Sequence, residues 1–209
     1  MALPNFAHLQ AQPDLLLAWL NTNVLLAGNL QNVGVAGAGG GIDQVTIGAY
    51  QGPVQNAINS SNGQPMGVHA LRNNPAGELT AYICNYQANN HRSDLIGTHA
   101  DYCFTTTLNG CTFAVGPVQP GNLRRVSHAN TGGNTNLQRQ QTRTAQQSGN
   151  LAGIALLEPA DYRRLSATLA ISATVFGIRT GLAWQFYFQT YSYANGTATV
   201  YGVFPFPGL

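Results

Sequence analysis

Apolar and β-branched residues are concentrated in short runs along most of this chain, and clusters of Gly, Pro or Asn separate the runs. Runs of this kind are typical of β-strands joined by tight turns. A longer apolar and aromatic segment covers 170–204, and its Asn195-Gly196 pair is typical of a hairpin turn. The pattern predicts two or three strands in that segment, and single strands at 44–50, 66–72, 78–86, 101–107, 111–117 and 123–129.

Helical periodicity is confined to a few segments. Apolar residues recur at helical spacing over 13–30, which predicts an amphipathic helix. Segment 134–148 is polar and rich in helix formers, and it predicts a solvent-exposed helix. Another helix is predicted to begin at Pro159, with Arg163 and Arg164 on a solvated face. The predicted fold class is therefore α+β: a β-sandwich of mixed or mostly antiparallel strands flanked by helices.

Length and charge narrow the classes of function. The chain has 209 residues and no linker-like segment, which predicts a single domain over 1–209. A net charge of +2 is too small to indicate nucleic-acid binding, and the longest apolar stretch, 168–178, is too short to span a membrane. All 9 basic residues are Arg. Either this reflects compositional drift, or the absence of lysine protects the protein from ubiquitin attachment in a eukaryotic cytosol.

Two further features limit the choice of compartment and cofactor. The N-terminal segment lacks the basic region and cleavage site of a secretory signal, so export would require a specialised route. The glycine-rich segment 34–43 does not match a phosphate-binding G-x-G-x-x-G motif, because Ile42 stands where the last glycine is required. His91 and His99 flank Asp94, but their spacing does not match a metal site. We therefore expect no metal and no cofactor.

The three cysteines, Cys84, Cys103 and Cys111, are an odd number, so at least one is free. Cys84 and Cys103 lie inside predicted strands and are expected in the core. Cys111 directly follows the turn pair Asn109-Gly110, which would mount its side chain at the edge of a sheet. An exposed thiol with a lowered pKa at this point could act as a nucleophile, with the N–H groups of Gly110 and Cys111 as an oxyanion hole. The alternative is a buried cysteine that acts as a small hydrophobic residue.

A cysteine nucleophile requires a base, and His128 is the best candidate. It lies in the next predicted strand, 123–129, and neighbouring strands can bring two such side chains within reach. Arg124 and Arg125 could favour the thiolate electrostatically. Because the sequence positions no acidic residue near His128, a backbone carbonyl is expected to orient the imidazole.

The segment Leu108-Asn109-Gly110-Cys111, followed by a β-rich run and by His128, resembles the Leu-Ser-Gly-Cys…His pattern of glutamine deamidase toxins of the cytotoxic necrotizing factor and Burkholderia lethal factor type. The resemblance in sequence covers about 25 residues, and the length of the chain is also similar to that of the lethal factor. It implies that Cys111 is the nucleophile, that His128 is the base, and that the backbone carbonyl of Thr105 orients His128. Asn109 departs from the serine of the pattern, although asparagine suits a turn equally well.

The resemblance implies a secreted bacterial effector that acts as a monomer in the host cytosol and converts a glutamine of one host protein to glutamate. By likeness to the lethal factor, the target would be the translation-initiation RNA helicase (initiation factor 4A), and protein synthesis would stop. By likeness to the necrotizing factor, it would be a Rho-family GTPase. The loops at 34–41 and 87–99 are expected to select the substrate. A cysteine protease or transglutaminase, and a non-catalytic β-sandwich binding module, remain as alternatives.

Overall fold

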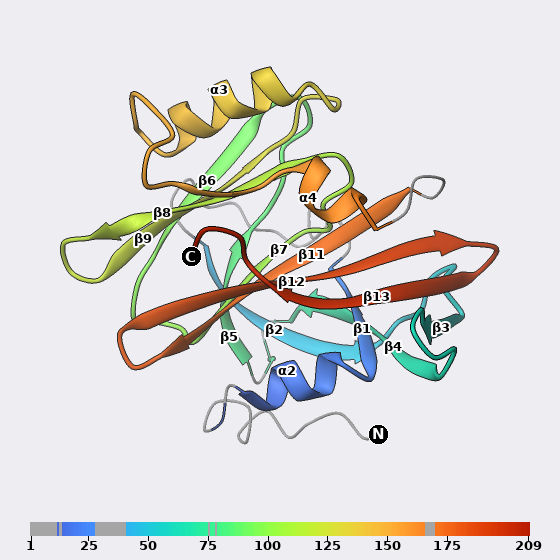
Figure 1. The fold of residues 1–209 in the computed structure, drawn as a ribbon. Coiled ribbons are helices and arrows are strands. Elements are labelled where there is room, and N and C mark those ends of the chain that lie inside the picture. Colours follow the sequence, from blue (N-terminus) through green and yellow to red (C-terminus); the bar gives the residue numbers. More distant parts are fainter. Residues whose placement is uncertain (1–11, 13, 28–40, 75, 78, 166–169) are drawn as a thin grey trace.

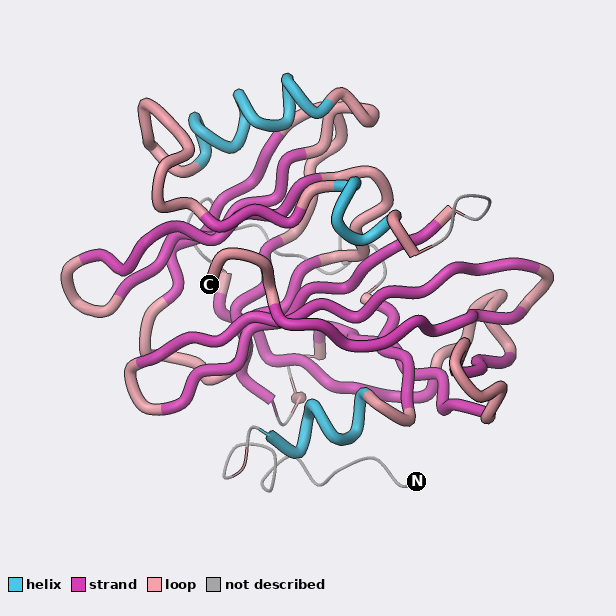
Figure 2. The backbone as a smooth tube through the Cα atoms, in the orientation of Figure 1, coloured by secondary structure: helices cyan, strands magenta, loops and turns pink. Residues whose placement is uncertain are grey.

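The structure is a computed structural model that describes residue 12 and residues 14–27, 41–74, 76–77, 79–165 and 170–209. Most of the described chain is strand (Figures 1 and 2). The larger sheet contains, in spatial order, β1 (Asn23–Leu26), β4 (Pro65–Asn73), β2 (Ile42–Ala49), β5 (Leu79–Cys84), β7 (Tyr102–Thr105), β11 (Ile171–Thr180), β12 (Ala183–Ala194), β13 (Thr197–Pro205) and β3 (Asn56–Asn59).

The larger sheet closes on itself. β3 pairs in parallel with β13 and in antiparallel with β4, where Ala57 lies opposite Met66. This second pairing joins the two ends of the strand order and forms a barrel of 8 strands, while β1 pairs in parallel with β4 as an additional strand. Two buried polar side chains of the barrel bind the backbone of β1. Leu25 donates its N–H to Gln189, and its carbonyl accepts a hydrogen bond from Thr174.

A second, smaller sheet packs against one side of the barrel. Its order is β10 (Ala155–Leu157), β8 (Thr112–Gln119), β9 (Leu123–Ala129) and β6 (His91–Ile96), all antiparallel. β5 of the barrel contacts both β6 and β9 of this sheet. The layer between the two sheets is apolar, and the small sheet contributes Phe113, Val115 and Val126 to it.

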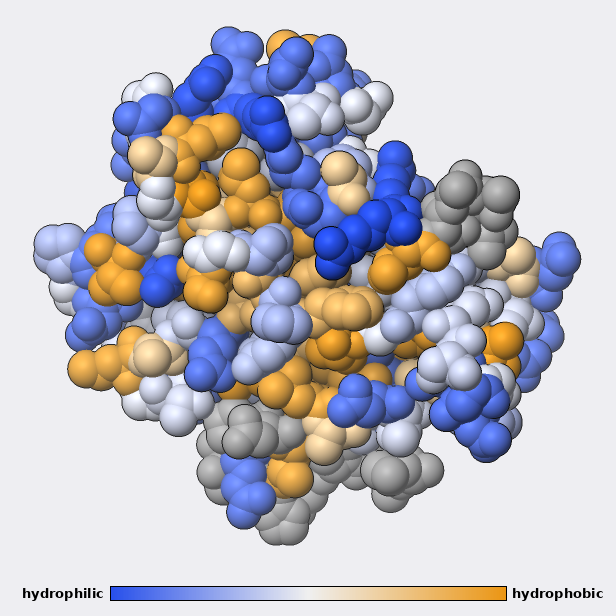
Figure 3. Space-filling view, in the orientation of Figure 1, coloured by the Kyte–Doolittle hydropathy of each residue, from blue (hydrophilic) through white to orange (hydrophobic). Residues whose placement is uncertain are grey.

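The helices lie outside the sheets. α3 (Thr135–Ala145) covers the outer face of the small sheet, and α2 (Asp14–Leu20) lies at the opposite end of the molecule, next to the strands β1, β2 and β4 (Figure 1). α4 (Pro159–Arg163) follows β10 and packs against β11. The region of α3 is mainly hydrophilic on the face seen in Figure 3. Among the described residues, no helix has the length and apolar character that crossing a membrane requires.

The predicted fold class is wrong. The chain forms a barrel with a separate sheet, and a helix-flanked β-sandwich is not present. Alternation of apolar and polar residues indicates only that one face of a strand is buried. This is true of a strand in a barrel wall and of a strand in a sandwich layer. The closure depends on β3, a four-residue strand that the apolar pattern did not predict.

Two local predictions also differ from the structure. The helix predicted over 13–30 ends at Leu20, and β1 follows at once, so Val24 is buried in a strand. The predicted loop 87–99 contains β6, which pairs with β9 throughout its length. Most of the predicted 34–41 loop lies outside the described residues.

Candidate active site

The segment before Cys111 is a tight turn anchored to the barrel. Leu108 pairs with Ala173 of β11 through two backbone hydrogen bonds of 2.7 and 3.0 Å. Gly110 has a φ of +86°, a left-handed conformation that a residue with a Cβ rarely adopts. Cys111 follows directly and precedes β8. The sequence therefore places a cysteine at a fixed point where the chain passes from the barrel to the small sheet.

Two buried side chains from the helices hold this turn. The hydroxyl of Tyr162 accepts the N–H of Gly110 at 2.8 Å and donates to the carbonyl of Cys111 at 3.0 Å. The amide of Gln138 donates to the carbonyl of Gly110 at 2.6 Å and accepts the hydroxyl of Thr112 at 2.6 Å. Tyr162 and Gln138 are both 0% exposed. The backbone on each side of Cys111 is thus held by polar contacts from α4 and α3.

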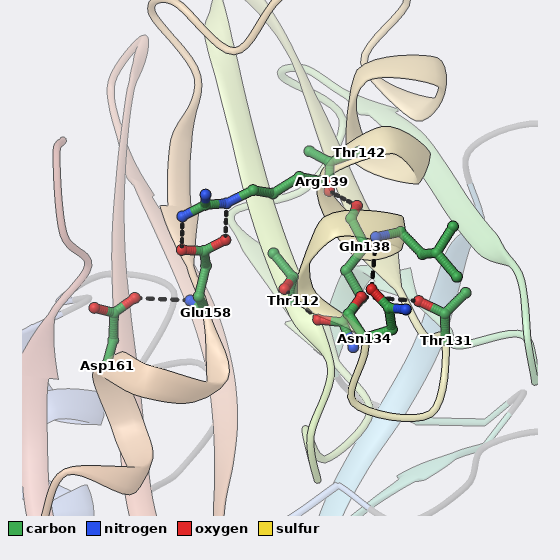
Figure 4. A network of polar contacts seen from close by, with 9 residues as sticks. Thr112, Thr131, Asn134, Gln138, Arg139, Thr142, Glu158 and Asp161 are labelled. Carbon is green, nitrogen blue, oxygen red and sulfur yellow. Dashed lines mark hydrogen bonds and ion pairs between the residues drawn. The ribbon is translucent and has the colours of Figure 1, made fainter.

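The two helices are themselves linked across the end of the small sheet. Arg139 of α3 forms a bidentate ion pair with Glu158, with distances of 2.6 and 2.7 Å, and Glu158 precedes α4. The N–H of Glu158 donates to the carboxylate of Asp161, which caps α4 (Figure 4). Figure 4 also shows Gln138 pointing from α3 toward Thr112. The polar network therefore connects α4, α3 and the first residue of β8.

His128 lies on the same face of the small sheet as Cys111. It is opposite Phe113 in the β8–β9 pairing, and Cys111 precedes Phe113 by two residues. Cys111 belongs to the apolar cluster between the two sheets, and His128 contacts Thr105 of β7, so both side chains face the barrel. Both side chains are buried: His128 is 0% exposed and Cys111 is 5% exposed.

The hydrogen bonds of His128 define its tautomer. Thr105 donates its hydroxyl proton to the carbonyl of Cys84 at 2.8 Å, so the Thr105 oxygen is an acceptor for Nδ1 of His128 at 3.1 Å. The proton is therefore on Nδ1, and Nε2 carries a lone pair. Within the described structure, Nε2 is buried and has no hydrogen-bond partner. His128 is thus a neutral base, oriented by the Thr105 hydroxyl where the sequence resemblance implied the Thr105 carbonyl.

The electrostatics differ from the sequence-based expectation of an exposed thiol with a lowered pKa. Burial raises the pKa of the Cys111 thiol, although a hydrogen bond from the backbone N–H of Asn109 and the charge of Arg163 act in the opposite direction. Burial also lowers the pKa of His128 to about 3. In the resting protein the pair is therefore a neutral thiol and a neutral imidazole, so the thiol requires a base during attack.

The cation near Cys111 comes from α4. Arg163 donates to the side chain of Asn109 at 3.2 Å, and its guanidinium lies over Gly110. The expected pair, Arg124 and Arg125, is bound elsewhere: Arg124 donates to the carbonyl of Gly116, and Arg125 donates to Gln147. Arg163 therefore has a contact at the turn that the prediction of a purely solvated face did not include.

A cleft of about 300 Å³ opens beside the cysteine. Its lining residues are Ala27, Tyr86, Thr106, Thr107, Asn109, Cys111 and Asn130. Within the described structure, no hydrogen bond joins the thiol of Cys111 to Nε2 of His128, so proton transfer requires the two groups to come into closer alignment. Of the two amides predicted for an oxyanion hole, that of Gly110 is occupied by Tyr162. Among the described residues, the N–H of Cys111 donates to no protein acceptor.

The other candidate residues are placed away from the cleft. Cys84 and Cys103 are free and buried, and burial raises the pKa of both thiols. Burial raises the pKa of the Asp94 carboxyl group, and His91 is the first residue of β6. Across the described ranges, His, Cys, Asp and Glu side chains form no group of three that could hold a metal ion.

The chain is only distantly similar to known proteins. No model of a protein family matches the chain, and no curated protein matches it. Among solved structures, the chain is similar to the C-terminal domain of CNFy from Yersinia pseudotuberculosis, with a TM-score of 0.39 and 10% sequence identity over 78% of this chain and 72% of that one. A likeness at this level does not establish a shared activity, so the site itself must support any functional conclusion.

Removing the hydroxyl of Tyr162 is expected to loosen the turn at 108–111. Tyr162→Phe keeps the ring but leaves the N–H of Gly110 and the carbonyl of Cys111 without this partner, which should lower the free energy of unfolding in urea by about 1–3 kcal/mol. Tyr82→Phe is the matched control, since that hydroxyl is also buried and accepts the N–H of Gly97 at 3.0 Å.

Only the Tyr162 variant should change the rate at which iodoacetamide alkylates Cys111, because only its hydroxyl contacts the turn. The alkylation rates are measured by mass spectrometry of the peptide that carries Cys111. Equal rates in the two variants would show that Tyr162 contributes stability alone.

Proposed function

We propose that this protein is a cysteine-dependent deamidase that converts a glutamine of a host protein to glutamate, as a bacterial effector exported into the host cytosol. The observation that carries the proposal is the pairing of Cys111 and His128. Both project from one face of the small sheet, and Nε2 of His128 is unprotonated and has no partner among the described residues. The motif around Cys111 supports the same reaction through its resemblance to the deamidase toxins.

The reaction begins with the thiol of Cys111. Nε2 of His128 accepts the thiol proton as the sulfur attacks the carboxamide carbon of glutamine, and the N–H of Cys111 donates to the oxyanion. His128 then returns the proton to the leaving nitrogen, so ammonia departs and a thioester remains. Water, deprotonated by His128, attacks the thioester, releasing the free thiol and a glutamate side chain. The net change consumes one water and produces one ammonia.

The neutral resting pair is compatible with this sequence of steps. Because both groups are buried, an ion pair formed before the substrate arrives would be costly. Proton transfer during attack forms charge only when the oxyanion also forms and can be stabilised. The buried Nε2 lone pair is the proton acceptor that this order of events requires.

The proposed substrate is the translation-initiation RNA helicase, and a Rho-family GTPase is the second candidate. The new negative charge on the target would alter a functional surface of that protein. The protein is proposed to act as a monomer, as the resemblance to the deamidase toxins implies.

Treatment of the two candidate targets tests the proposal. The purified protein is incubated with the helicase and, separately, with a Rho-family GTPase, and the targets are analysed by peptide mass spectrometry. We expect one glutamine-containing peptide of one target to show the mass of an amide-to-acid conversion. Chain cleavage would indicate a protease, a cross-linked product would indicate a transglutaminase, and two unmodified targets together with slow, equal alkylation of all three cysteines would favour a binding module.

A further inference from the structure

Thr106 has a buried hydroxyl with no partner, and it lines the cleft beside Cys111. Its side chain is 2% exposed, and no hydrogen bond is made by Oγ1 within the described structure. The threonines on either side are both satisfied: Thr105 donates to the carbonyl of Cys84 and Thr107 donates to the carbonyl of Ala27, each at 2.8 Å. Thr106 is therefore the exception in a run of three threonines.

Other unpartnered polar atoms lie at the same end of the barrel. Cys84 and Thr105 are opposite each other where β5 and β7 end, so Asn85 and Thr106 are the next residues of two neighbouring segments. The side-chain oxygen of Asn85 is buried and has no partner in the described structure, as is the case for Nε2 of His128. A buried polar group without a partner is unfavourable, and such a group in the wall of a cleft, as Thr106 is, is typical of a site completed by a ligand.

The lining of the cleft restricts the chemistry of that ligand. Every described residue that lines it is uncharged, and its polar side chains are the hydroxyl-bearing Tyr86, Thr106 and Thr107 and the amides Asn109 and Asn130. The hydroxyl and amide groups of this lining can hydrogen-bond a neutral amide, and the cation beside it, Arg163, is bound to the side chain of Asn109. A primary carboxamide, moreover, presents two N–H donors, which the product carboxylate lacks.

We propose that the hydroxyl of Thr106 is the subsite for the primary carboxamide nitrogen of the substrate, an inference that rests on the proposed deamidase function. Oγ1 of Thr106 accepts one N–H of the carboxamide when Cys111 attacks its carbon. The contact holds the nitrogen that leaves as ammonia, and it is lost when the acid forms. Thr106 is then a substrate-binding residue that selects primary amides over acids and over substituted amides.

Replacement of Thr106 by valine tests this role. Thr106→Val removes the hydroxyl at nearly constant shape, and Thr190→Val is the matched control, because Thr190 is 0% exposed and its hydroxyl also lacks a partner among the described residues. Both variants are expected to unfold at the wild-type temperature or above it, since each loses an unsatisfied buried group. Only Thr106→Val should reduce kcat/KM for the deamidated target, by about tenfold, and Thr106→Ser should restore it.

A second measurement does not depend on deamidase activity. Cys111 is alkylated with iodoacetamide and with its N,N-dimethyl derivative. To correct for the intrinsic reactivity of each reagent, its rate with Cys111 is divided by its rate with the thiol of glutathione. The wild type should prefer the primary amide, whereas Thr106→Val should lose the preference and Thr190→Val should keep it. An unchanged preference, or a lower unfolding temperature for Thr106→Val alone, would overturn the proposal. If the preference is lost as expected but no target is deamidated by the wild type, the subsite stands and the proposed function fails.

Discussion

Replacement of Cys111 by serine is expected to reduce deamidation by at least about 10⁴-fold, because the hydroxyl is a far weaker nucleophile and the thioester cannot form. The variant changes one atom in a buried side chain that is 5% exposed, so the turn and the cleft should keep their shape. Cys103→Ala is the matched control: that thiol is free and buried in the barrel wall, away from the cleft lining. Deamidation is followed by ammonia release and by the mass of the target peptide.

Replacement of His128 should also reduce deamidation, but by a smaller factor than replacement of Cys111. With a neutral thiol at rest, His128→Ala removes the base, and deamidation should fall by about 10²- to 10⁴-fold at neutral pH. Alkylation of Cys111 should also slow in this variant and recover as pH rises, since hydroxide then removes the thiol proton. Retained activity in Cys111→Ser, or a His128→Ala enzyme as fast as the wild type, would contradict the proposed mechanism.

The sequence predicted the local chain geometry around Cys111 and His128, while their roles in catalysis stay predictions. The short connection between two predicted strands was sufficient to expect Cys111 and His128 on adjacent segments, and in the structure β9, which contains His128, pairs with β8, which directly follows Cys111. The Asn195-Gly196 turn joins β12 to β13 with φ values of +50° and +80°, as a two-residue hairpin requires. These features involve residues close in sequence or one hairpin apart.

The parts that were missed depend on residues distant in sequence. Tyr162 contacts the Cys111 turn across 51 residues, and no local pattern indicates that pairing. A signal was available for Gln138, because Gln138, Thr142 and Gln146 recur at a spacing of four over α3 and its C-terminal cap. All three are buried, as is Ala145, while most of the helix is exposed. A polar row that faces a sheet predicts hydrogen bonds to the sheet, here to Gly110 and to Thr112.

The wrong predictions have the same cause. β1 was predicted as a continuation of the first helix because its apolar residues fit a helical face, but its pairing with β4 and its bond to Gln189 are tertiary. The thiol of Cys111 was predicted to be exposed because a turn precedes it. The structure covers that turn with Tyr162 and Gln138, so burial raises the pKa of the thiol.

Between pH 7 and pH 3, the protonation of His128 by itself is expected to lower the free energy of unfolding by about 4 kcal/mol. The pKa of this imidazole falls from 6.5 to about 3 on folding because the ring is buried. Below pH 6.5 the unfolded chain therefore binds a proton that the folded protein does not. The contribution of His128 to the free energy of unfolding is fully present above pH 6.5. It is lost as pH falls toward 3, by up to about 1.36 kcal/mol per pH unit.

Asp94 acts in the opposite direction. Burial raises the pKa of its carboxyl group, so the folded state gains stability from this group as pH falls through its titration. The total pH dependence of the wild type thus combines terms of both signs, and it does not isolate His128. A variant that cannot accept a proton at position 128 is required to separate them.

His128→Gln provides that separation, since glutamine is neutral at every pH in the window. The free energy of unfolding is measured by urea denaturation at several pH values from 7 to 3 for the wild type, for His128→Gln and for His99→Gln, a variant of an exposed histidine. The difference between the wild type and His128→Gln should change by about 4 kcal/mol across the series, with the variant less sensitive to acid. His99→Gln should follow the wild type. A parallel course for His128→Gln and the wild type would mean that Nε2 is protonated in the folded protein or reaches solvent, and the neutral base on which the mechanism depends would then be absent.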